Sequence, residues 1–210
     1  MRKVLILLGL FTLSLAAYYS LQDIRIPVFL MTEEPNVIVK GNNGQVLIIE
    51  LDFEHDGLVE FITSPNSRNT LFLLDADLIE RADHLVELLN TYQRATGLLG
   101  ETLETVEQDI AVYENAFDNK PLWFMLKGYM YEDTLKRTLF EQQINMIAPS
   151  LVVRNNVLPK KLEKGTILSL PVYKETNVDF TQFSDWVAKQ HFLSIEESLF
   201  GYSLKTKRYP

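Results

Sequence analysis

The sequence predicts a single α/β domain in which a mostly parallel sheet or barrel carries helices on its outside. Apolar, β-rich segments alternate along the chain with amphipathic helical segments, an order typical of parallel strands joined by helices. The 210 residues contain no internal repeat and no low-complexity segment. About 185 residues remain beyond the apolar amino terminus, enough for one domain with a sizeable core.

Residues 1–21 form the first expected element, a signal peptide or a membrane anchor. Arg2 and Lys3 precede the uncharged run "VLILLGLFTLSLAA", which is a basic region followed by an apolar one. Residues 14–16 have the small-x-small pattern of a cleavage site, whereas an uncut run reaching residue 21 is long enough to span a bilayer. Both alternatives place the rest of the chain outside the cytoplasm, either secreted or anchored to the membrane by residues 4–21.

The domain itself is expected at residues 45–210, after a linker at 22–44. Its first strand is residues 45–53, "QVLIIELDF", an apolar run bounded by the turn cluster "GNNG". Residues 58–63 are compatible with the return arm of a hairpin or with a short helix. Similar β-rich patterns predict further strands at residues 70–74, 121–126, 145–153 and 165–172.

Four helices are expected between and after these strands, because their apolar residues recur at three- and four-residue spacing. Leu85, Leu88 and Leu89, for example, share one face of a helix. In parallel α/β folds the chemistry lies at the carboxyl ends of the strands, which directs attention to residues 52–56, 75–77 and 125–128 and to Arg154. The predicted helices are residues 82–90, 102–117, 132–143 and 180–191.

Composition excludes several functional classes. The formal net charge is −8, and a chain this acidic is a poor candidate for nucleic acid, whose phosphates need clustered Lys and Arg. There is no cysteine, so disulfides, thiolate metal sites and a catalytic thiolate are excluded. The acidic balance also favours a basic partner over an anionic one.

Several segments, taken in order, resemble the polysaccharide deacetylase family, whose catalytic domain is the NodB-homology domain. The resemblance spans roughly residues 45–172 and rests on "NTLFLLDADLIERADHLVELL", on residues 104–146 and on "GTILSLPV". It implies a deformed (β/α) barrel, and a divalent metal held by one Asp and two His beside a second Asp that acts as base. Such a metal polarises the acetyl carbonyl of an N- or O-acetylated glycan and activates water.

The chain departs from all three motifs of that family. The counterpart of Thr-Phe-Asp-Asp-Gly is Phe53-Glu54-His55-Asp56-Gly57, where the ligand spacing is altered. The His-x-x-x-His motif aligns with residues 99–103, which have leucine at both ends, and Arg-Pro-Pro aligns with residues 125–128, "MLKG". The chain has three histidines, at 55, 84 and 191, so no close imidazole pair exists. The resemblance therefore implies a member that has lost deacetylase chemistry.

The candidate site residues follow from this alignment and from the strand ends. Glu54, His55 and Asp56 could equally form a polar turn, and Asp77 or Asp83 could simply cap a helix. Asp75-Ala76-Asp77 also resembles the Asp-x-Asp motif of glycosyltransferases, in which the aspartates hold a metal bound to a sugar nucleotide. The candidates are Asp52, Glu54, His55 and Asp56 for catalysis, His55, Asp56, Asp75 and Asp77 for metal, and Lys127, Tyr129 and Tyr131 for ligand binding.

The sequence thus predicts a non-catalytic domain that binds cell-envelope glycan or an envelope protein. No cofactor is expected. One alternative is a metal-dependent carbohydrate deacetylase with an altered ligand set, which would need a divalent metal such as zinc. The second alternative is the glycosyltransferase that uses Asp75 and Asp77.

Overall fold

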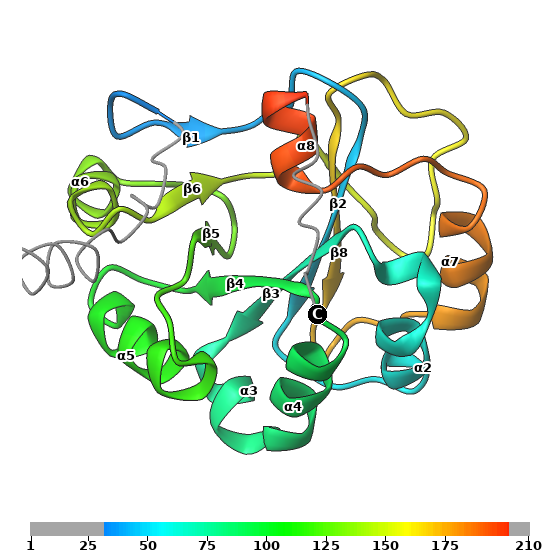
Figure 1. The fold of residues 1–210 in the computed structure, drawn as a ribbon, viewed down its shortest axis with the longest axis horizontal. Coiled ribbons are helices and arrows are strands. Elements are labelled where there is room, and N and C mark those ends of the chain that lie inside the picture. The colour runs from blue at the N-terminus through cyan, green and yellow to red at the C-terminus, as the bar shows by residue number, and fades with distance from the viewer. Residues whose placement is uncertain (1–31, 202–210) are drawn as a thin grey trace, which may run out of the picture. The chain divides into compact units, whose positions relative to one another are not determined.

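A computed structural model describes residues 32–201, which form a curled parallel sheet with helices on its outer side (Figure 1). The sheet has eight strands in the order β1-β6-β5-β4-β3-β2-β8-β7, and every neighbouring pair is parallel. The predicted parallel α/β architecture is confirmed, in the form of an open half-barrel whose edges are β1 and β7. The strands are β1 (Val37–Ile38), β2 (Val46–Leu51), β3 (Thr70–Asp75), β4 (Ala95–Gly100), β5 (Trp123–Leu126), β6 (Asn145–Ile147), β7 (Leu151–Val152) and β8 (Ile167–Val172).

Both faces of the central strands are buried, as is usual where helices cover a parallel sheet. In β2, Leu47, Ile49 and Leu51 belong to the core that the helices cover, whereas the alternate residues Ile48 and Glu50 lie on the inner side of the curved sheet. The helices are α2 (Leu58–Thr63), α3 (Ala76–Arg81), α4 (Asp83–Thr91), α5 (Val106–Phe117), α6 (Asp133–Glu141), α7 (Phe180–Val187) and α8 (Ile195–Phe200), with a 3-10 turn at Pro65–Ser67.

Three predicted elements need correction. Residues 145–153 form two strands, β6 and β7, because Pro149 lies between them and has no N–H for a sheet hydrogen bond. The ambiguous segment at 58–63 is helix α2, so the hairpin alternative is wrong. The helix predicted from residue 82 is preceded by a separate short helix, α3, which starts directly after β3.

Strand β4 and helix α8 were not predicted from the sequence. Strand β4 lies between β3 and β5, and helix α8 follows the last predicted helix. Asn42 and Asn43 donate their backbone N–H groups to the carbonyl of Ser198 in α8, and the Trp123 indole N–H donates to Glu196 at 3.3 Å. Helix α8 thus lies at the amino ends of β2 and β5, opposite the strand ends that carry the candidate residues (Figure 1).

The predicted signal peptide or anchor, residues 1–21, lies outside the described residues. Within residues 32–201 no helix has the length and apolarity needed to cross a membrane. Part of the predicted linker does belong to the sheet, since β1 pairs with β6 through Val37 and Met146.

Candidate functional site

Four charged residues meet at the carboxyl edge of the sheet. Asp52 follows β2, Asp75 ends β3, Glu101 follows β4 and Lys127 follows β5. Because these four strands are parallel neighbours, their carboxyl ends lie side by side. The Lys127 Nζ lies 2.6 Å from a Glu101 oxygen, 3.0 Å from an Asp75 oxygen and 3.3 Å from an Asp52 oxygen. We call these four residues the lysine cluster.

The backbone around Lys127 directs its side chain into the cluster. The Lys127 N–H donates to the Gly100 carbonyl at 2.8 Å, which ties the end of β5 to the end of β4. The next two residues have left-handed φ angles, 78° at Gly128 and 63° at Tyr129. Glycine adopts this conformation without strain, so the chain can turn sharply directly after the lysine. The ammonium also lies 5.7 Å from the centre of the Tyr173 ring.

The electrostatics of the cluster keep Lys127 charged. Burial by itself favours the neutral amine and would lower its pKa, but the hydrogen bonds and charges of Glu101 and Asp75 outweigh that effect. The pKa of Lys127 is therefore raised above its ordinary value. The lysine side chain is 19% exposed and those of Asp52 and Asp75 are 23% and 12% exposed, so solvent screens these contacts only in part.

Asp75 has a second role as the N-cap of α3. Its Oδ1 accepts the Asp77 N–H at 2.9 Å, while its Oδ2 contacts Lys127. The predicted caps, Asp77 and Asp83, are therefore wrong, because each lies within the first turn of its helix. The glycosyltransferase alternative requires Asp75 and Asp77 to face a pocket large enough for a nucleotide sugar, and it is contradicted if either residue is buried as a helix cap. Asp75 is 8% exposed and bonded through both of its oxygens.

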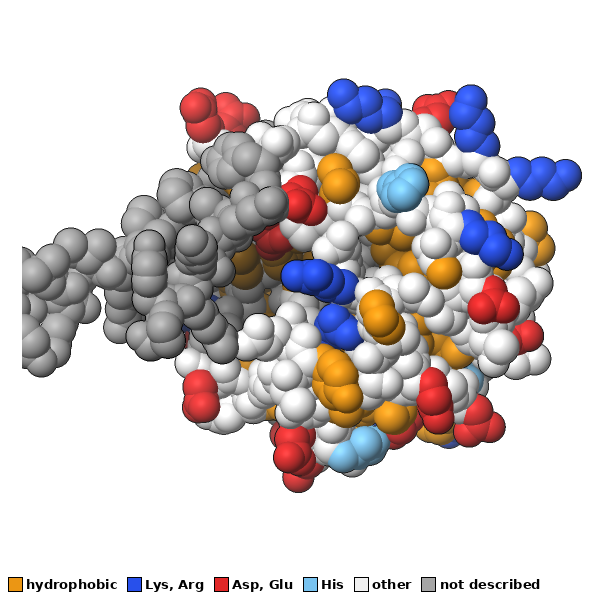
Figure 2. Space-filling view, turned by 45° about the vertical axis from the view of Figure 1, so that its right-hand side comes forward, with side chains coloured by type: hydrophobic (Ala, Val, Ile, Leu, Met, Phe, Trp, Pro, Cys, Tyr) orange, Lys and Arg blue, Asp and Glu red, His pale blue; other side chains and the backbone are white. Residues whose placement is uncertain are grey.

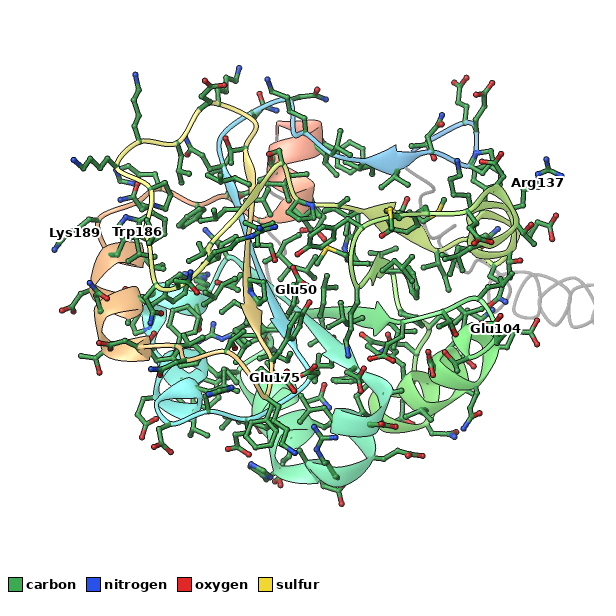
Figure 3. The ribbon with its side chains drawn as sticks, turned by 180° about the vertical axis from the view of Figure 1, so that it is seen from behind. Glu50, Glu104, Arg137, Glu175, Trp186 and Lys189 are labelled. Carbon is green, nitrogen blue, oxygen red and sulfur yellow. The ribbon has the colours of Figure 1, made fainter. Side chains whose placement is uncertain are left out.

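A second polar group lies beneath the cluster, on the inner side of the sheet, around Glu50. This carboxylate is fully buried and accepts hydrogen bonds from three hydroxyls. Tyr129 donates at 2.6 Å and Ser169 donates to the same oxygen, while Tyr173 donates to the other oxygen. Figure 3 shows Glu50 near the middle of the molecule, with the strands around it. Tyr173 connects the two groups, because its hydroxyl bonds Glu50 and its ring lies beside Lys127.

Burial and the neighbouring Glu50 charge raise the pKa of both tyrosine hydroxyls, at Tyr129 and Tyr173. The hydroxyls therefore stay protonated and act as donors to the carboxylate. Tyr129 was predicted as a ligand-binding residue, and the structure shows its hydroxyl donating to Glu50. Glu50 itself was not predicted, although a single acidic residue inside the apolar strand "VLIIEL" was a usable signal.

The turn at Glu54, His55 and Asp56 does not join the lysine cluster. It lines a neighbouring groove of about 640 Å³ between the end of β2 and helices α2 and α3. His55 Nε2 donates to the Tyr173 carbonyl at 2.8 Å, and Glu54 pairs with His84 Nε2 at 2.9 Å. The predicted catalytic set is therefore divided, with Asp52 in the cluster and the other three beside the groove. The other groove-lining residues are Phe53, Gly57, Val59, Glu60, Leu78, Arg81 and Ala82.

Tyr131 has a structural hydrogen-bonding role. Its hydroxyl accepts the Leu126 N–H at 2.9 Å and donates to the Ile147 carbonyl at 2.7 Å, joining the ends of β5 and β6. Burial raises the pKa of this hydroxyl. The proposed ligand-binding role of Tyr131 therefore has no free hydroxyl to support it.

No family model matches the chain, and no curated protein matches it. Solved structures do match. A pseudoenzyme of carbohydrate esterase family 4 from Bacillus anthracis is 14% identical, with 79% of this chain and 69% of that one covered at a TM-score of 0.61. The fold is that of the family 4 carbohydrate esterases. The predicted resemblance to polysaccharide deacetylases is thus confirmed at the level of the fold.

Proteins described as enzymes, and not as pseudoenzymes, share this fold too. A family 4 carbohydrate esterase from Bacillus anthracis is 10% identical and aligns over 80% of this chain and 89% of that one, at a TM-score of 0.63. The chitin deacetylase of the fungus Colletotrichum lindemuthianum is 11% identical over 80% and 93%, at a TM-score of 0.62. The fold by itself therefore does not decide between catalysis and its loss.

The residues at the strand ends do not fit the metal that the resemblance implies. A divalent cation needs open ligands, and here a fixed ammonium occupies the space among the three carboxylates. His55 and His84 are both engaged in the neighbouring groove, and His191 is exposed. Across residues 32–201 no three His, Asp or Glu side chains have the spacing of a metal site.

Proposed function

We propose that the chain is an exported or membrane-tethered deacetylase-like domain that has lost metal-dependent hydrolysis and binds cell-envelope glycan. The observation that carries this proposal is the position of the Lys127 ammonium, bonded to Asp52, Asp75 and Glu101 at the carboxyl edge of the sheet. A metal-dependent hydrolase needs a cation and a water there, and a charged lysine repels the former and displaces the latter.

The groove beside the cluster supports glycan binding. Its volume of about 640 Å³ is suited to a short stretch of sugar. Phe53, which is 37% exposed, offers an apolar ring for a sugar face, and Glu54, Asp56 and Arg81 offer partners for hydroxyls.

An envelope protein is the second candidate partner. Glu54, Asp56 and Glu60 line the groove and the whole chain carries a charge of −8, which favours a basic partner. In Figure 2 acidic and basic side chains are interspersed over the visible face, without a large single-sign patch. This supports the expectation that nucleic acid is not the partner.

The deacetylase alternative finds less support. Its proposed ligands were Asp52, Glu54, His55 and Asp56, but Asp52 contacts Lys127 and His55 donates its Nε2 proton to a backbone carbonyl. An imidazole nitrogen that donates a hydrogen bond cannot at the same time ligate a metal.

The test combines an activity assay with a sedimentation assay on the full-length chain. We expect no acetate release from acetylated chitooligosaccharides or peptidoglycan fragments with added zinc, cobalt or manganese. We also expect the chain to co-sediment with purified peptidoglycan, and a Phe53→Ala variant to co-sediment less. A Val157→Ala variant, altered at an exposed apolar residue that does not line the groove, is the control. Metal-dependent acetate release that is lost in a His55→Ala variant would overturn the proposal.

A further inference from the structure

The acidic residues of the lysine cluster come from three neighbouring strand ends and share a single counterion. An ammonium has three N–H donors, and Lys127 has three carboxylate partners, in Asp52, Asp75 and Glu101. The donor groups of the lysine are therefore all used within the cluster.

The charges of this cluster do not balance. Three carboxylates face one ammonium, which leaves a formal charge of −2, the charge that a divalent cation would neutralise. The guanidinium of Arg81 contacts Asp52 as well, but it donates to the backbone carbonyl of that residue rather than to its carboxylate. Without the lysine, the three carboxylates would repel one another with no positive side chain bonded to them.

The lysine side chain cannot easily leave this position. Its backbone N–H is bonded to Gly100 and the turn that follows is fixed by the Tyr129 N–H, which donates to the Leu126 carbonyl at 3.0 Å. The Tyr173 ring lies on one side of the ammonium, and that ring is held by its hydroxyl on Glu50. These backbone and aromatic contacts hold the Lys127 ammonium in one position.

We propose that the Lys127 ammonium takes the place of a divalent cation at this edge of the sheet and keeps metal out of it. Removing the ammonium converts Asp52, Asp75 and Glu101 into a cation site. This proposal rests on the proposed function, because it names Lys127 as the residue responsible for the loss of metal-dependent hydrolysis.

Distances explain why the site is closed as it stands. The lysine holds the three oxygens at 2.6–3.3 Å, which are hydrogen-bond lengths, whereas zinc–oxygen bonds are about 2.0–2.2 Å. A zinc ion in the same place would draw the oxygens inward by roughly 0.4–1.3 Å, most for Asp52 and least for Glu101. Glu101 is 61% exposed and free to move, and Asp75 keeps its Oδ2 available while its Oδ1 caps α3.

The experiment compares metal affinity in the untagged full-length chain and its Lys127→Ala variant, by calorimetric titration with manganese and cobalt chloride. We expect no stoichiometric binding by the wild type and one equivalent bound by the variant, with an affinity roughly a hundredfold or more higher. A Lys127→Ala/Asp75→Asn double variant is expected to lose that binding. Lys136→Ala, which removes a half-buried lysine paired with the exposed Asp133, is the matched control and should bind no metal.

Lys127→Gln is the second variant, since it keeps the length of the side chain if alanine prevents folding. Metal should raise the melting temperature of either variant and leave that of the wild type unchanged. The inference is overturned if the folded variants bind no metal, or if the wild type binds one equivalent with the affinity of Lys127→Ala. The proposed function fails on a different result, acetate release by the wild type, so the two failures are distinguishable.

Discussion

At the scale of single residues, Glu50 is a fully buried carboxylate, which is stable only when its oxygens are bonded. Tyr173 supplies the donor for one of the two oxygens. A Tyr173→Phe variant keeps the ring beside Lys127 but removes this hydrogen bond. Because the acceptor is charged, we expect the free energy of unfolding to fall by about 1.5–3 kcal/mol in urea denaturation at neutral pH.

The matched control for that substitution is Tyr92→Phe, which removes the hydroxyl of a tyrosine that is 42% exposed. Exposed substitutions of this kind change stability by about 0.5 kcal/mol or less. If the two variants were equally stable, the hydroxyl of Tyr173 would not be needed to keep Glu50 buried.

At the scale of elements, strand β4 shows where the sequence was insufficient. The segment "ATGLLG" is short, and its two glycines lower its β propensity, so the pattern alone does not predict a strand. The structure gives a reason for Gly97. A Cβ there would lie 2.6 Å from the Trp123 carbonyl oxygen and 2.9 Å from the Trp123 Cβ, so the glycine allows β4 and β5 to approach.

A Gly97→Ala variant is therefore expected to lose about 1–3 kcal/mol of unfolding free energy, because it must displace backbone atoms of β5. Thermal and urea unfolding, followed by circular dichroism, measure the loss. Gly128→Ala is the comparison variant. An added Cβ at residue 128 would meet no atom within 4 Å, so the only cost is that alanine must adopt a φ of +78°. We expect about 1 kcal/mol for that strain. Wild-type stability in Gly97→Ala would show that β4 and β5 do not depend on this close approach.

At the scale of the whole molecule, periodicity and strand-end position predicted the architecture and three of the four residues of the lysine cluster. The long apolar strands and amphipathic helices were recognisable from their own residues, and Asp52, Asp75 and Lys127 were singled out by position. What could not be predicted is which of these side chains meet. That depends on the order β5-β4-β3-β2, in which the unpredicted β4 brings Glu101 between Asp75 and Lys127. The position of His55 outside the lysine cluster, although it lies close to Asp52 in the sequence, likewise depends on the direction of the turn that follows β2.

Buried tyrosines make the stability of the whole fold sensitive to alkaline pH. Burial raises the pKa of Tyr113 to about 12, against an ordinary value of 10.0, although its hydrogen bond with Thr96 at 2.7 Å acts in the opposite direction. Burial also raises the pKa of Tyr129, Tyr131 and Tyr173. Since the pKa is higher in the folded chain, each group contributes stability below pH 10 that is lost as the pH rises through its folded value.

We therefore expect the unfolding free energy to decline steeply above pH 10, and the decline to be smaller in Tyr113→Phe. Between pH 10 and 12 the wild type should lose about 2–3 kcal/mol more unfolding free energy than this variant. The variant lacks the Tyr113 phenol, whose pKa is 10.0 in the unfolded chain and about 12 in the folded chain. Urea titrations across this range measure the difference, and tyrosinate absorbance follows the ionisation directly. Parallel declines in the two proteins, or a Tyr113 that ionises near pH 10 in the folded chain, would show that this hydroxyl is open to water and that the contact between β4 and α5 is loose.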